Sequence, residues 1–260
     1  MSELSQDERR HQVQQGLAAV QGRITQAVQA AGRDSDDVAL IAVTKFFPLS
    51  DCQLLLEMGQ VDFGESRDQE ASEKIPDLRD WAQARGDNGT SDSRPFTTHF
   101  VGQVQSKKAR SLARYVDVVH SVDRPKLVTA LDRAVQHACE AGERSEGMGA
   151  LIQVNFDSDA AADRGGVSPS EVPALAEKIA RSDHLRLLGL MAVAPQGAQG
   201  QEAQEAFDSL AAACHDLKQV YPQANWMSAG MSGDLEEAIN AGATHLRVGG
   251  AILGSRYPGR

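Results

Sequence analysis

Hydrophobic residues in this chain follow two patterns: short apolar runs, and longer stretches with helical periodicity. The first helical stretch covers residues 6–31, where Val13, Leu17 and Val20 follow one another at spacings of four and three. The first apolar run ends at Lys45, and six of the seven residues before that lysine are aliphatic or alanine. The run is too short to span a membrane and is closed by Pro48, so it predicts a strand buried on both faces, as in parallel sheets.

Eight runs of this kind alternate with helical stretches, and none is joined to the next by an Asn-Gly hairpin signal flanked by alternating residues. The predicted strands are 38–45, 60–66, 98–104, 115–122, 150–155, 185–195, 225–230 and 244–253. This order predicts an α/β fold, a (β/α)8 TIM barrel formed as a single domain by residues 1–260. The eighth strand leaves no room for a helix after it, so we expect the N-terminal helix, within residues 1–32, to take that place. An open doubly wound sheet is the alternative, but Lys-Phe-Phe-Pro stands where its phosphate-binding glycine loop belongs.

Polar residues mark the boundaries of these elements. Ser168 has the most complete helix-start signal, since Pro169 follows it and Glu171 occupies the capping-box position. The predicted N-cap residues are Ser50, Asp123, Ser168 and Ser232. Within residues 79–97 the apolar pattern lapses into Gly, Ser, Asp and Asn, which predicts an exposed insertion.

Composition narrows the range of partners. With 41% hydrophobic and 24% charged residues, the chain has the balance of a globular protein with a substantial core. Its net charge of -10 argues against nucleic acid or an anionic membrane as a partner. The N-terminal residues lack the apolar centre of a secretory signal, so we expect a cytoplasmic protein. The three cysteines are far apart and odd in number, so neither a disulfide framework nor a metal site is expected.

Chemistry-bearing residues stand where predicted strands end, which is where barrel enzymes place their active sites. Lys45 ends the first strand, although it could simply mark the point where the strand reaches water. Ser232, in the sequence GMSGD, follows the seventh strand, and Gly249 and Gly250 end the eighth, so these residues could hold a phosphate. Arg247 shares a strand face with Gly249; it points either into the barrel or outward to a carboxylate. A lysine, an anion-binding loop and an arginine together fit pyridoxal 5'-phosphate (PLP).

Longer motifs strengthen that interpretation. They are AVTKFFP, FGES followed by Gln69-Glu70, HFVGQVQSKK, GLMAVAP, SAGMSGDLEEAI and LRVGGAILGSR. Together they resemble the YggS/PROSC family of pyridoxal phosphate homeostasis proteins, which is similar to the barrel domain of alanine racemase. The resemblance covers nearly the whole chain and implies that Lys45 holds PLP as a Schiff base and that Arg247 contacts the pyridine nitrogen. It also implies that Ser232, Gly249 and Gly250, with Ser228, hold the phosphate.

The sequence departs from the family pattern at a few positions. Ser66 and Arg67 replace the usual Asn-Tyr, and Thr98 replaces a usual Trp. Gly250 replaces a common Thr, which removes a hydroxyl from the expected phosphate site. His99 lies near the start of its predicted strand, away from the expected site, so we assign it a structural role.

Two functions from different classes follow. The first is a non-catalytic protein that buffers or delivers PLP, with PLP itself and apo forms of PLP-dependent enzymes as partners, acting as a monomer or weak homodimer. An arginine beside the ring nitrogen supports it, because a second positive charge there is unfavourable. The second is a PLP-dependent amino-acid racemase, which needs another acid/base; Tyr115, Tyr221 and Tyr257 all lie away from the predicted site. A sugar-phosphate barrel enzyme without PLP stays open as a third.

Overall fold

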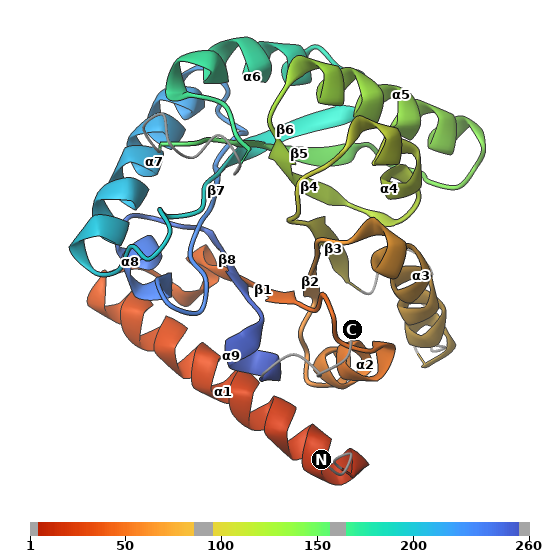
Figure 1. Ribbon diagram of the computed structural model, residues 1–260, viewed down its shortest axis with the longest axis vertical. Coiled ribbons are helices and arrows are strands. Elements are labelled where there is room, and N and C mark those ends of the chain that lie inside the picture. The colour runs from red at the N-terminus through yellow and green to blue at the C-terminus, as the bar shows by residue number, and fades with distance from the viewer. Residues whose placement is uncertain (1–4, 86–95, 157–164, 255–260) are drawn as a thin grey trace.

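The protein is a closed barrel of eight parallel strands in sequence order, surrounded by helices (Figure 1). The structure is a computed structural model that describes residues 5–85, 96–156 and 165–254. The strands are β1 Ala39–Val43, β2 Asp62–Glu65, β3 Thr97–Phe100, β4 Val118–Val122, β5 Met148–Gln153, β6 Leu185–Met191, β7 Trp226–Ser228 and β8 His245–Val248. The TIM-barrel prediction is therefore confirmed. It holds because each strand buries both faces, one against the helices and one inside the barrel.

Helices alternate with the strands and form the outer ring (Figure 1). They are α1 Gln6–Ala30, α2 Leu49–Glu57, α3 Asp68–Arg85, α4 Ala109–Tyr115, α5 Pro125–Glu140, α6 Val172–Ala180, α7 Gln201–Val220, α8 Leu235–Asn240 and α9 Gly250–Leu253, with 3-10 turns η1 Ser35–Asp37, η2 Ser106–Lys108 and η4 Pro169–Glu171. The long helix α1 packs against α8, α9 and α2. It thus fills the place in the ring beside β8, as the sequence predicts. The expectation that no helix follows the eighth strand was wrong, because β8 ends at Val248 and the short helix α9 begins at Gly250.

The main hydrophobic core lies between the strands and the helices. It includes Phe63 of β2, Leu246 of β8 and Val20 of α1, all almost completely buried. A second, small cluster of Val118, Leu151 and Met191 is separate from it. The space inside the barrel is otherwise lined largely by polar side chains, which are described below.

Several boundaries differ from the predictions. Helix α2 starts at Leu49 after Pro48, so Ser50 is not its cap. Helix α5 has Arg124 and not Asp123 at its N-cap, and α8 has Asp234, whose carboxylate accepts the Met231 N–H at 2.6 Å, in place of Ser232. Only the Ser168 capping box forms as expected. The N-cap residues of α2, α5 and α8 make no side-chain hydrogen bond to the free N–H groups of their helices, so a nearby polar residue was a misleading signal at these three starts.

The expected insertion has different bounds in the structure. Helix α3 continues through Pro76 to Arg85, because Leu78 is fully buried and Arg79 pairs with Asp117 at 2.9 Å. Phe96 is buried and Thr97 opens β3. Residues 79–85 and 96–97 therefore belong to or adjoin regular elements, and the remainder of the predicted insertion, 86–95, lies outside the described residues.

No helix among the described residues is long and apolar enough to cross a bilayer. The cysteines lie on separate helices: Cys52 on α2, Cys139 on α5 and Cys214 on α7.

Candidate functional site at the C-terminal end of the barrel

Lys45 lies two residues beyond the end of β1, at the end of the barrel where the strands lead into the following helices. Its neighbour Thr44 is fully buried, whereas Lys45 itself is half-buried. The next residue, Phe46, has a φ of 69°, a left-handed conformation that is rare for a bulky side chain. The chain therefore makes a sharp turn directly after the lysine, and such backbone strain is typical of functional sites.

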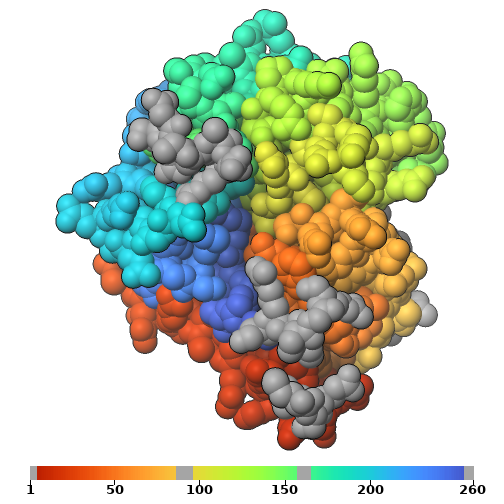
Figure 2. Space-filling model, in the orientation of Figure 1, coloured from red at the N-terminus to blue at the C-terminus, as the bar shows by residue number. Residues whose placement is uncertain are grey.

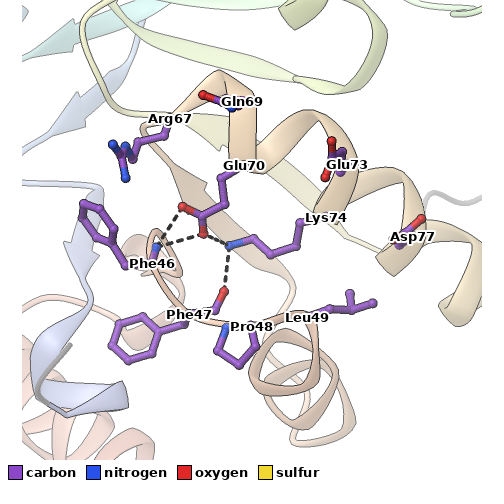
Figure 3. Close-up of a pocket in the computed structure, with 10 residues that line it drawn as sticks. All are labelled: Phe46, Phe47, Pro48, Leu49, Arg67, Gln69, Glu70, Glu73, Lys74 and Asp77. Carbon is purple, nitrogen blue, oxygen red and sulfur yellow. Dashed lines mark hydrogen bonds and ion pairs between the residues drawn. The ribbon is translucent and has the colours of Figure 1, made fainter. Parts of the chain in front are cut away.

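Helix α3 holds this turn through two side chains, Glu70 and Lys74 (Figure 3). The Glu70 carboxylate accepts the Phe46 N–H at 2.9 Å and 3.2 Å. The Lys74 ammonium donates to the carbonyl oxygens of Thr44 at 2.9 Å and Phe47 at 3.0 Å. The backbone on both sides of Phe46 is thus bound to one face of α3, because residues four apart share a helix face.

Charges beneath the turn keep Lys74 ionised. Its ammonium lies 2.8 Å from the Glu65 carboxylate and 2.7 Å from that of Glu70. Burial opposes the charged form of Lys74, but Glu65, Cys52 and Glu70 together more than compensate, so the pKa of the ammonium is raised. Burial raises the pKa of Glu65, which also accepts the Thr44 hydroxyl at 2.6 Å. The turn after Lys45 therefore rests on a small buried ion network.

A hollow of about 570 Å³ opens beside the turn. It is lined by Phe46, Phe47, Pro48, Leu49, Arg67, Gln69, Glu70, Glu73, Lys74 and Asp77. Figure 3 shows Glu70 and Lys74 directed toward the turn, whereas Glu73 and Asp77 take no part in the drawn contacts. The Arg67 guanidinium lies over the Phe46 ring at 4.9 Å, so this departure from the family pattern contacts the same turn.

Arg247 of β8 points into the barrel and not toward the outer helices. Its Nη1 donates to the Ser228 hydroxyl of β7 at 2.7 Å, and its Nη2 donates to the Ala192 carbonyl beyond β6 at 2.9 Å. Nε makes no hydrogen bond to any described residue, which leaves a donor for a ligand. Burial lowers the pKa of Arg247 to about 10, against the opposing effect of the Asp234 carboxylate. The guanidinium is still charged at neutral pH.

Ser228 connects Arg247 to two histidines inside the barrel. Its Oγ lies 2.9 Å from Nδ1 of His120 on β4, and Nε2 of His120 lies 2.9 Å from Nδ1 of His99 on β3. Nε2 of His99 lies 3.0 Å from the Asp62 carboxylate on β2. We call Ser228, His120, His99 and Asp62 the interior relay. Strands β4 and β7 are not neighbours in the sheet, so this contact crosses the barrel interior.

One arrangement of hydrogens satisfies both ends of the interior relay, because arginine can only donate and carboxylate can only accept. In it the Ser228 hydroxyl accepts from Arg247 and donates to His120; His120 donates from Nε2 to His99, which donates to Asp62. Burial, together with the neighbouring His99 and Arg247, holds the pKa of His120 well below its usual value. The His120 imidazole is therefore uncharged between Ser228 and His99.

The predicted phosphate-binding glycines after β8 lie close to the end of β1. Strand β8 pairs with β1, with Ile41 opposite Arg247. A Cβ added at Gly249 would come within 2.8 Å of the Val43 carbonyl, so only glycine allows β8 to leave the sheet this close to β1. Gly250 is exposed with open space where a side chain would be. In Figure 2 the blue surface of the C-terminal segments adjoins the orange surface that follows β1.

Ser232 is held in this region by the long helix α1. Arg23 of α1 donates to the Ser232 carbonyl at 2.9 Å and forms two 2.7 Å hydrogen bonds with the Glu236 carboxylate. A second hollow of about 380 Å³ lies nearby, lined by residues 193–199 together with Met231, Gly233 and Asp234. Ser232 thus lies in a loop with an open neighbourhood, although it does not cap α8.

Sequence reasoning missed the residues that support these groups. Glu70 was noted only as part of a motif, and Lys74, His120 and Asp62 were not singled out. His99 was placed near the start of its strand, whereas it is the third residue of β3 and completely buried. Tyr115 is the last residue of α4 and not a strand residue, and its hydroxyl donates to Asp68 at 3.2 Å. The alternating pattern of VVHSV in β4 was the one signal that could have placed His120 inside the barrel.

Known proteins share this architecture. The family described as "Alanine racemase, N-terminal domain" matches residues 16–257. The pyridoxal phosphate homeostasis protein of Mycobacterium bovis is 40% identical over 252 residues, 96% of this chain and 95% of the relative. An unknown protein from Bifidobacterium adolescentis has a TM-score of 0.84 at 29% identity, with 96% of this chain and 98% of that chain covered.

One similar structure was solved with a ligand. PipY of Synechococcus elongatus, with PLP bound, has a TM-score of 0.70 at 31% identity and covers 89% of this chain and 100% of its own. The extent of the similarity to curated relatives confirms the resemblance found in the motifs. This chain belongs to the alanine racemase N-terminal domain family and, within it, to the YggS/PROSC family of pyridoxal phosphate homeostasis proteins.

Proposed function

We propose that this protein binds PLP and serves intracellular PLP homeostasis by buffering or delivering the cofactor. The observation that carries the proposal is the pairing of β1 with β8, which brings Lys45, Arg247 and Gly249 to one end of the barrel. Relatives named pyridoxal phosphate homeostasis proteins, and PipY with PLP bound, support the same conclusion.

The residues present fit PLP. Lys45 supplies the primary amine to which the aldehyde attaches as a Schiff base, and PLP supplies an electrophilic carbonyl and an aromatic ring that can accept electrons. Gly249, Gly250 and Ser232 offer backbone N–H groups and a hydroxyl for the phosphate. Arg247 has one nitrogen without a described partner and is the group for the ring nitrogen. Ser228 has its hydroxyl bonded to Arg247 and His120, so we assign it to holding Arg247 rather than the phosphate.

Arg247 also supports a carrier over a catalyst. Its charge lies in a buried position, where it opposes protonation of a ring nitrogen beside it, and an unprotonated ring accepts electrons weakly. Release to apo forms of PLP-dependent enzymes belongs to this proposal. A cytoplasmic location and a monomer or weak homodimer stay predictions from the sequence.

The direct test is the attachment site. The purified protein should absorb in the visible range, and borohydride reduction followed by peptide mass spectrometry should place the pyridoxyl group on Lys45. Lys45→Ala should abolish both signals, whereas Lys126→Ala, on helix α5, should keep them. An adduct found only on another lysine, such as Lys107 or Lys126, would contradict the assignment, and a colourless protein that takes up no PLP would favour the sugar-phosphate alternative.

A second measurement separates the carrier from the racemase. Proton NMR in deuterium oxide should show no exchange at the α-carbon of a panel of amino acids when the protein is fully loaded with PLP. Exchange above that given by free PLP would show catalysis and would replace the carrier hypothesis with the racemase.

A further inference from the structure

The turn that carries Lys45 has a conformation that its own sequence does not favour. Phe46 has a φ of 69°, and it is the only non-glycine residue with a positive φ among those that the structure describes. An isolated Lys-Phe-Phe segment would avoid this region because the Cβ crowds the backbone there. Something outside the turn must therefore hold it.

Glu70 and Lys74 hold the turn with opposite hydrogen-bonding roles, one as an acceptor and the other as a donor. Glu70 accepts from the backbone N–H of Phe46, and Lys74 donates to the carbonyls of Thr44 and Phe47. The two side chains also bind each other at 2.7 Å. They therefore tie both a donor and two acceptors of the turn to a rigid helix, and the Lys45 side chain starts from the middle of the fixed segment.

Lys74 is buried between two carboxylates, those of Glu65 and Glu70. Lys74 is only 7% exposed and has Glu65 behind it, while Glu70 is partly open to the hollow beside the turn. Breaking either contact of a buried ammonium with its two carboxylates strongly destabilises the folded protein. The contacts that Lys74 makes with the turn are therefore buried, whereas the contact made by Glu70 is accessible to solvent.

We propose that Glu70 and Lys74 are positioning residues for cofactor attachment: they hold the turn at Phe46 in its left-handed conformation and so direct the Lys45 amine to the mouth of the barrel. This inference rests on the proposed function. It adds a role for two side chains of α3 that need not touch the cofactor.

The first experiment needs no cofactor. In the apo protein, Glu70→Ala should speed hydrogen exchange of the Phe46 amide by roughly tenfold or more, because that amide loses its carboxylate acceptor. Glu70→Gln keeps an acceptor oxygen and should restore most of the protection. Glu73→Ala, one helix position earlier than Lys74 and without a hydrogen bond to any described residue, is the matched control and should leave the exchange rate unchanged. Equal exchange rates in Glu70→Ala and Glu73→Ala would overturn the proposal.

The second experiment links the turn to attachment. After mixing with PLP, Glu70→Ala should form the Lys45 adduct about fivefold to tenfold more slowly than wild type, within the range expected for the net loss of one ordinary hydrogen bond. Phe46→Gly removes the Cβ that makes the left-handed turn unfavourable. In that background, Glu70→Ala should slow attachment by less than twofold. An undiminished effect of Glu70→Ala in the Phe46→Gly background would show that Glu70 does not act through the turn.

The failure of this inference can be told apart from the failure of the proposed function. A wild-type protein that forms no adduct on Lys45 contradicts the proposed function and, with it, any role in attachment. A wild type that forms the adduct at the same rate as Glu70→Ala contradicts only the positioning role.

Discussion

The two sides of the candidate site are supported in opposite ways. On the β1 side, the turn after Lys45 is held from outside the barrel by the charged residues Glu65, Glu70 and Lys74, with solvent at one edge. On the β8 side, Arg247 is held from inside by neutral hydrogen-bonding groups that are almost wholly buried. The difference follows from where charge can be accommodated: a charge network needs several ions in contact, whereas a dry interior favours neutral groups around a single ion.

On the β1 side, removal of one ion should cause the largest loss in the free energy of unfolding. Lys74→Met leaves the Glu65 carboxylate, which is 0% exposed, without its counter-ion. The free energy of unfolding in urea should fall by about 3–5 kcal/mol at pH 7. Lys178→Met, at an exposed position on α6, should change it by less than about 0.5 kcal/mol. A loss for Lys74→Met as small as that of the control would remove the contrast between the two sides.

On the β8 side, acid should lower the free energy of unfolding through the buried histidine His245. Burial lowers the pKa of His245 to about 4. In the unfolded chain this imidazole takes up a proton near pH 6.5, so between about pH 4 and 6.5 the unfolded state binds more protons than the folded state. Stability should be insensitive to this group above about pH 6.5 and should fall as the pH approaches 4, by on the order of 3 kcal/mol.

The contribution of His245 can be isolated by comparing unfolding curves across that pH range. His245→Gln should flatten the decline, since it removes the group that titrates differently in the two states. His11→Gln, at an exposed position on α1, should keep the wild-type slope. Equal slopes in the two variants would show that His245 is not the group responsible.

Removing the middle of the interior relay should have a smaller effect than removing Lys74. His120→Phe takes away the acceptor of the Ser228 hydroxyl and the donor to His99. Ser228 and His99 each lose one of their buried hydrogen bonds, and no charge is left unpaired, so we expect a loss of about 2–3 kcal/mol in the free energy of unfolding. Urea denaturation at pH 7 would measure it, and a loss equal to that of Lys74→Met would mean that the relay is as costly to break as the ion network.

The smallest effect is expected at the phosphate loop. Ser232→Asp places a negative charge where the phosphate is proposed to bind, and it should weaken PLP retention by roughly tenfold through repulsion of like charges. Equilibrium dialysis would measure the change. Ser209→Asp, exposed on α7, adds the same charge elsewhere and should have little effect; unchanged retention in Ser232→Asp would place the phosphate in another loop.

The sequence predicted the barrel and the groups at its mouth for the same reason. Strands buried on both faces produce apolar runs, and a polar residue at the end of such a run is easily seen, as with Lys45 and Arg247. The supporting residues gave no such signal. Glu70 and Lys74 look like ordinary solvent-facing helix residues four positions apart, and only the tertiary contact of α3 with the β1 turn shows that they are partly or fully buried.

The interior relay could not be predicted from local pattern either. Its residues lie on β2, β3, β4 and β7, and they meet only when the sheet closes. The register between β4 and β5 also shifts between Val119 and Val122, which a strict alternation of side chains does not anticipate. The predicted N-cap of α8 was also wrong: Asp234 occupies that position without a side-chain hydrogen bond to the helix, and its carboxylate accepts the Met231 N–H instead.

The contact between Gly249 and the Val43 carbonyl lies at the seam where the first and last strands seal the barrel. During synthesis Lys45 leaves the ribosome early, whereas Arg247 and Gly249 follow about 200 residues later. A nascent chain therefore has the amine long before it has the rest of the pocket. Under the proposed function, PLP can bind only after β1 and β8 have paired, and bound PLP then links the first and last strands of the barrel.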